Sequence, residues 1–134
     1  MSRTIIRLLR DNTLDATSTN PALVSAFNLL DWSPYWNNAV LELKVSNGSI
    51  PELAGNVIRL YYTYSSFDVN LQLAPQTFET VSVLETTTSG IPDTSAIVSS
   101  GSIPVEGDWL YTWIETDRPL LQPVTINLIT LKIN

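Results

Sequence analysis

The sequence has 134 residues, of which 44% are hydrophobic and 15% are charged, and it contains neither Cys nor His. This length suits one domain with a hydrophobic core, and the hydrophobic content excludes an intrinsically disordered chain. The absence of Cys and His excludes disulfides, thiolate catalysis, sulfur-ligated zinc and any mechanism that uses an imidazole.

Seven segments have the composition of β-strands, because they are rich in Val, Ile, Thr, Tyr and Trp and are bounded by Gly, Pro, Asn or Ser. They are, in chain order, residues 3–9, 22–30, 39–46, 56–65, 79–86, 108–116 and 123–133. A short eighth strand is expected at residues 95–98, inside a Ser/Thr/Gly/Pro-rich connection that runs from Thr86 to Ile103. Only in the second segment does a short helix compete with a strand.

Alternation of apolar and polar residues predicts which side chains face the core. In residues 39–46 it places Leu41, Leu43 and Val45 inside, and in residues 79–86 it places Val81 and Val83 inside. Seven or eight strands without a helix predict an all-β protein, an antiparallel β-sandwich of jelly-roll or Greek-key type. We expect one domain over residues 1–134, with residues 1–12 as a docking arm or an edge strand.

The tetrapeptide Gly-Ser-Ile-Pro occurs twice, at residues 48–51 and 101–104, and each copy is followed by Gly, then Asn or Asp, and then a strand. Pro fixes φ and removes a hydrogen-bond donor, which suits the residue before a strand. We therefore predict that both copies form the same structural corner and not a binding motif. Asn47-Gly48 predicts a tight hairpin turn, and we interpret the Asn-Gly-Ser sequon there as turn chemistry.

The net charge of −6 is unevenly distributed. Arg3, Arg7 and Arg10 lie in a first decapeptide without acidic residues, whereas the rest of the chain carries four basic and thirteen acidic residues. An acidic body repels phosphates, so we predict no nucleic-acid partner. No apolar run approaches the roughly 18 residues of a membrane-spanning helix, so we predict no membrane partner. Arg7 interrupts the short apolar run at the start, which argues against a signal peptide and for synthesis in a cytoplasm.

The basic N-terminal segment is predicted to contact another chain. Its arginines would select an acidic partner, and its apolar residues would supply most of the binding. The residues expected at this contact are Arg3, Ile5, Arg7, Leu8 and Arg10. We expect deletion of residues 1–10 to leave the domain folded and to weaken assembly.

The sequence shows no catalytic motif. It has no P-loop, no Gly-x-Gly-x-x-Gly and no Ser-x-x-Lys. Paired carboxylates among Glu106, Asp108, Glu115 and Asp117 could form a glycosidase site, but acidic residues in turns are ordinarily solvated. We therefore predict no catalytic residue, no cofactor and no metal site. Oxygen-rich stretches such as residues 11–15 leave open a structural Ca²⁺.

Aromatic residues gather in two places. Trp32, Tyr35 and Trp36 lie in a loop segment and are predicted to contact a partner. Trp109, Tyr111 and Trp113 share one face of a strand, and Leu110, Thr112 and Ile114 share the other. One face must be core, and we favour the face of Trp109 and Trp113. If the other face is core, the exposed aromatic face becomes a sugar-stacking platform or a protein interface.

The chain resembles small β-sandwich capsid decoration (cement) proteins of bacteriophages. The resemblance rests on the Thr/Ser/Asn-rich β composition, the basic N-terminal segment and the closing stretch 107–134, in which Gly precedes an aromatic strand and a long apolar last strand. It implies a non-enzymatic structural protein on the virion surface, a homotrimer that binds the major capsid protein or another virion protein. No functional residue is transferred by position.

The sequence is also compatible with two other functions. In the first, a carbohydrate-binding module or receptor-binding head would stack glycans on Trp32, Trp36, Trp109 and Trp113. In the second, the chain would be the carboxylate-dependent glycosidase considered above. The first reading would be supported by a shift in tryptophan fluorescence when glycans are added.

Overall fold

The structure is a computed structural model that describes residues 3–14, 22–28, 38–65, 81–104 and 109–133. These residues contain strands and turns and no helix, so none of them forms a helix that could cross a membrane. The all-strand composition confirms the predicted fold class. The strands are β1 (Arg3–Leu14), β2 (Ala22–Asn28), β3 (Asn38–Asn47), β4 (Val57–Ser65), β5 (Ser82–Thr87), β6 (Ser95–Pro104), β7 (Trp109–Thr116) and β8 (Val124–Ile133).

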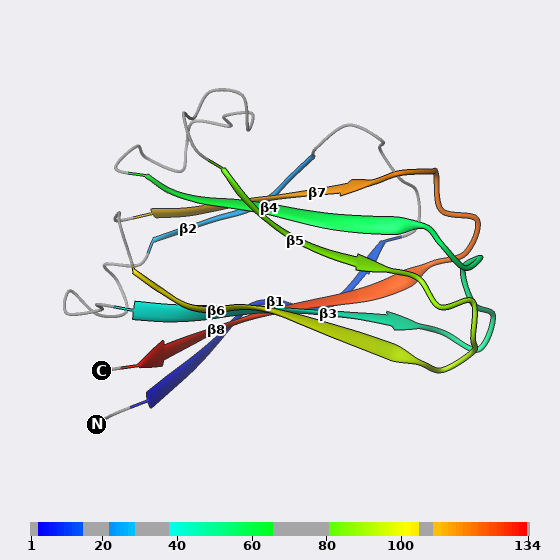
Figure 1. Cartoon of the computed structure of the whole chain (residues 1–134), viewed down its shortest axis with the longest axis horizontal. Coiled ribbons are helices and arrows are strands. Elements are labelled where there is room, and N and C mark those ends of the chain that lie inside the picture. The colour runs from blue at the N-terminus through cyan, green and yellow to red at the C-terminus, as the bar shows by residue number, and fades with distance from the viewer. Residues whose placement is uncertain (1–2, 15–21, 29–37, 66–80, 105–108, 134) are drawn as a thin grey trace.

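The strands form two four-stranded sheets that face each other, as Figure 1 shows. One sheet has the order β1-β8-β3-β6 and the other has the order β2-β7-β4-β5. All pairs are antiparallel, and β1 with β8, β2 with β7, β3 with β6 and β4 with β5 nest like one long hairpin. A long hairpin rolled into two sheets is a jelly roll, the first of the two predicted topologies.

The core lies between the sheets, where side chains that alternate along the strands meet. Leu41, Leu43 and Val45 point into it from β3, as their alternation predicts. Leu60 of β4 and Leu128 of β8 are also fully buried there. Burial of each such side chain contributes about 1.5–3 kcal/mol, so this layer supplies the main driving force for folding.

Strand β7 is buried on both faces, which corrects the choice made from the sequence. Leu110 and Ile114 lie in the core between the sheets. Tyr111 and Trp113 occupy the opposite face, yet they are 0% and 1% exposed, and their rings stack with centroids 5.8 Å apart. A strand between two neighbours in a sheet can be covered on both sides, so the assumption that one of its faces is wet does not hold.

In β5 the predicted inward face is also wrong. Leu84 is buried in the core at 5% exposure, whereas Val83 is 45% exposed. The register explains this, because Leu84 pairs with the inward-facing Leu60 of β4 and Val83 pairs with Tyr61. Val81 and Val83 suggested an apolar inward face, but Leu84 on the opposite face makes the core contact.

The two Gly-Ser-Ile-Pro copies do not form the same corner. The first follows β3 in the connection to β4, and the second lies inside β6 at a register shift, where Gly101 has φ 69°. Asn47-Gly48 forms no hairpin either, because β3 and β4 belong to different sheets and Gly48 has no positive φ. The predicted long connection after Thr86 is also shorter, because β5 and β6 leave only residues 88–94 between them.

Candidate functional site

The first group of predicted contact residues lies on β1. The segment with Arg3, Arg7 and Arg10 forms β1, an edge strand whose backbone pairs with β8 of the same chain from Arg3 to Leu14. Ile5 and Leu8 lie on the same strand, and the side chains of β1 are outside the described part of the structure. Contact of this strand with another chain stays a prediction.

Two of the aromatic candidates, Trp109 and Trp113, lie within the described residues. The loop residues Trp32, Tyr35 and Trp36 lie outside the described residues. Trp113 is 1% exposed, so a sugar has no access to its ring in this conformation. Trp109 is half-buried, and a stacking role for it stays a prediction.

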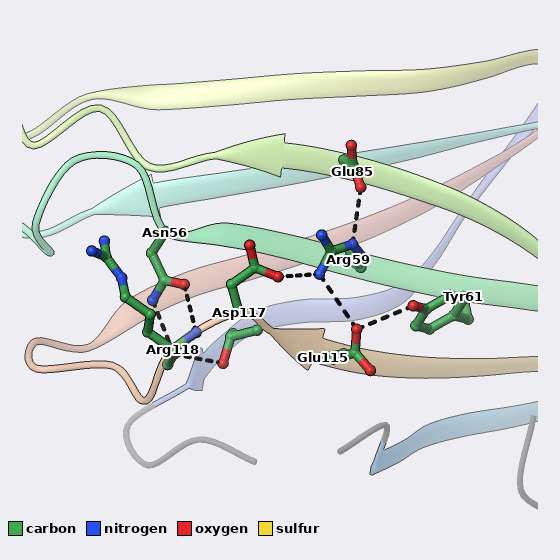
Figure 2. Close-up of polar contacts among 8 residues, drawn as sticks. Asn56, Arg59, Tyr61, Glu85, Glu115, Asp117 and Arg118 are labelled. Atoms are coloured by element: carbon green, nitrogen blue, oxygen red, sulfur yellow. Dashed lines mark hydrogen bonds and ion pairs between the residues drawn. The ribbon is translucent and has the colours of Figure 1, made fainter. Parts of the chain in front are cut away.

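A cluster of charged residues occupies the outward face of the sheet β2-β7-β4-β5, as Figure 2 shows. Arg59 is at its centre on β4, and the register places Glu85 of β5 and Glu115 of β7 directly beside it. Arg59 Nε lies 3.0 Å from Glu85 Oε2, and Arg59 Nη1 lies 3.4 Å from Glu115 Oε1. Asp117, which follows β7, makes a further ion pair with Arg59 Nη1.

One guanidinium thus serves three carboxylates, which leaves the cluster with a net charge of −2. The hydrogen bond from Arg59 to Asp117 is the main reason that the pKa of Arg59 is raised above its ordinary value, so this residue stays protonated. Tyr61 donates to Glu115 Oε1 at 3.1 Å, and burial together with this bond raises the pKa of Tyr61.

The cluster has the features of a structural ion-pair network and lacks those of a glycosidase site. Glu115 Oε1 already accepts hydrogen bonds from Arg59 and Tyr61. The other two candidate acids, Glu106 and Asp108, lie outside the described residues. Within the described ranges, no group of three or more acidic side chains could hold a metal ion.

A pocket between β3, β5 and β6 is too small for an ordinary ligand. It measures about 60 Å³ and is lined by residues such as Val45, Thr86 and Ala96. That volume accommodates a water molecule or a few, whereas ligand pockets typically start near 300 Å³. This pocket therefore offers no substrate site.

Three connections between strands lie together at one end of the sandwich, away from both termini (Figure 1). They are residues 48–56, 88–94 and 117–123, and we call them the loop end. Glu52 is 1% exposed, and its two oxygens accept hydrogen bonds from the backbone N–H groups of Leu53 at 2.8 Å and Leu121 at 2.7 Å. A buried carboxylate therefore ties the first connection to the third.

Asn56 and Thr88 complete this network. The Asn56 side chain donates to the carbonyl of Arg118 and accepts from its N–H, both at 3.1 Å (Figure 2). Thr88 Oγ1 donates to the Leu53 carbonyl at 2.6 Å and accepts from the Asn56 N–H at 3.0 Å. Sequence reasoning missed this network, because nothing local distinguishes a buried Glu or Asn in a loop from a solvated one.

Comparison with known proteins gives a likeness of fold. No protein-family model matches the chain, and no curated protein matches it. A chain from a solved structure of sacbrood virus of honeybee superimposes with a TM-score of 0.50 and 12% identity, over 97% of this chain and 70% of that chain. These values show a shared fold.

Two further solved structures come from Israeli acute paralysis virus. A chain of its pentamer has a TM-score of 0.43 and 13% identity, and covers 99% of this chain and 86% of that one. A chain of its heated full particle has a TM-score of 0.43 and 14% identity, and covers 96% of this chain and 68% of that one.

Proposed function

We propose that this chain is a non-enzymatic structural protein of a virus particle. The observation that carries the proposal is the jelly roll itself, because it comprises both sheets and matches the fold of the sacbrood virus chain over 97% of this chain. Fold alone does not determine function. The chemistry of the charged clusters described above agrees with the proposal, because Arg59 and its three carboxylates form ion pairs and Glu52 accepts backbone hydrogen bonds.

The finer proposal is a bacteriophage capsid decoration (cement) protein on the particle surface. It is supported by the sequence resemblance, which rests on the β composition, the basic N-terminal segment and the closing stretch 107–134. In this role the chain would contact the major capsid protein or another virion protein and its own copies, most simply as a trimer. Among the described strands, the basic strand β1 stands at one edge of its sheet, where such contacts would form.

Co-sedimentation with purified virus particles tests the proposal. The protein is mixed with particles from its own source, and the bound amount is measured across a density gradient as its concentration rises. We expect saturation at a fixed number of copies per particle and retention of the bound protein after dilution. Binding that never saturates, or no retention at all, contradicts the proposal. Tryptophan fluorescence with added glycans is measured in parallel, and a saturable shift would favour the carbohydrate-binding reading.

A further inference from the structure

Asn47-Gly48 is the one Asn-Gly pair of the sequence, and it does not form the predicted hairpin turn. Asn is a heat-sensitive residue, and before Gly it undergoes a spontaneous covalent change. The backbone nitrogen of Gly48 attacks Cγ of Asn47, so an N–Cγ bond forms, the Cγ–Nδ2 bond breaks, and ammonia leaves with the proton of the Gly48 N–H. Water then opens the cyclic imide at one of its two carbonyls, which gives aspartate or isoaspartate at position 47.

The surroundings of Gly48 leave room for this reaction. Gly48 is exposed, and a Cβ placed on it would meet nothing within 4 Å. Its φ is not in the left-handed region, so the structure does not require a glycine at this position. The conformation of Asn47 therefore decides whether the attack occurs, and Gly48→Ala is a substitution that the fold tolerates.

The fold holds the amide of Asn47 in other contacts. Asn47 is the last residue of β3, and its N–H donates to the Thr94 carbonyl at 2.9 Å. Its Nδ2 donates to the Ile91 carbonyl at 3.0 Å and to Ser89 Oγ at 3.3 Å. We call these three bonds the Asn47 junction, because they join the end of β3 to the connection 88–94. Attack by Gly48 requires the side chain to leave its two acceptors, so the reaction proceeds when the junction opens.

The product cannot restore the Asn47 junction. A carboxylate has no N–H to donate, so the oxygen that replaces Nδ2 would face the Ile91 carbonyl oxygen without a proton between them. The change also adds a negative charge to a chain that already carries −6. Isoaspartate further inserts a methylene group into the backbone at the end of β3. Each of these effects favours the open state of the junction.

We propose that Asn47 is a deamidation site that the Asn47 junction controls. The closed junction protects the amide, each opening exposes the Asn-Gly pair to attack, and conversion to an acid keeps the junction open. A transient opening is thereby recorded as a permanent covalent change. This inference goes beyond the proposed function and does not depend on it, because it concerns the folded chain alone.

Peptide mapping by mass spectrometry tests the proposal on the full chain after prolonged incubation at mildly alkaline pH, with and without denaturing urea. We expect Asn47 to convert at least about tenfold more slowly in the folded protein than in urea, because the hydrogen bonds of its junction must open first. Asn56, which is buried and precedes Val57, is the internal control and should stay an amide in the folded protein.

Two pairs of variants test the junction itself. Ser89→Ala removes one acceptor and should speed conversion in the folded protein about two- to tenfold, the factor of one neutral hydrogen bond. The control Ser46→Ala loses a hydroxyl contact with Ser95 but keeps both acceptors of Asn47, so it should change the rate less than about twofold. Gly48→Ala should slow conversion both in the folded protein and in urea.

The product is tested with Asn47→Asp, which should lower the midpoint of urea unfolding further than Asn38→Asp, the same change at the exposed start of β3. Four results would overturn the inference. They are no conversion of Asn47 in urea, equal rates in the folded and unfolded protein, equal rates for Ser89→Ala and Ser46→Ala, and equal midpoints for the two aspartate variants.

Discussion

Replacement of Glu52 by Gln tests whether the buried carboxylate holds the loop end together. Gln has the same shape but only one acceptor oxygen, so its NH₂ group must face the N–H of either Leu53 or Leu121 in a site that is 1% exposed. One hydrogen bond to a charged group is lost, which costs about 1.5–3 kcal/mol. For a domain of this size that corresponds to a fall in Tm of about 5–10 °C.

Urea unfolding of the wild type, Glu52→Gln and the control Glu85→Gln measures this effect. Glu85 is also paired, with Arg59, but its side chain is 54% exposed, so its replacement should cost no more than about 1 kcal/mol. Amide hydrogen exchange should show faster exchange at Leu53 or Leu121 in Glu52→Gln only. If Glu52→Gln loses no more stability than the control, the carboxylate does not join the two connections.

Three further predictions concern the rest of the fold. Arg59→Met should lower the free energy of unfolding by about 1 kcal/mol, because three carboxylates lose a partly exposed cation; an unchanged or raised value in urea unfolding would refute this. In an absorbance titration at alkaline pH, Tyr61→Phe should remove one phenol ionisation that the wild type shows. The pKa of that phenol should lie above the ordinary value of 10.0. The stability that the Tyr61 phenol contributes is therefore complete below pH 10.0 and is lost as the pH rises through the raised pKa. A missing phenol that ionises at or below 10.0 would contradict this prediction. Deletion of residues 1–10 should lower the unfolding midpoint markedly, because β1 pairs with β8 from Arg3 onward, and an unchanged midpoint would restore the docking-arm expectation.

Local patterns predict the positions of the strands well. β3 was expected at residues 39–46 and is found at Asn38–Asn47, because period-2 alternation and flanking turn residues are local signals. β6 is longer than the expected residues 95–98, because the strand continues to Pro104 through Gly101. Its φ of 69° accommodates a register shift inside the strand.

Features that depend on distant contacts could not be read in this way. The pairing of β1 with β8 joins opposite ends of the sequence, and the double burial of β7 depends on what covers each face of its sheet. The buried Glu52 is a loop residue whose acceptors are saturated partly by Leu121, far along the chain. Sequence reasoning therefore predicted the fold class but missed the loop end.

Quantitative mass spectrometry of gradient-purified particles from the protein's source tests the central claim most directly. A structural virion protein is present in every particle at a set number of copies. We therefore expect this chain in the particle peak, at a constant ratio to the major shell protein across all fractions. If the chain is recovered only among free proteins, or its ratio varies from fraction to fraction, it is not a structural part of the particle.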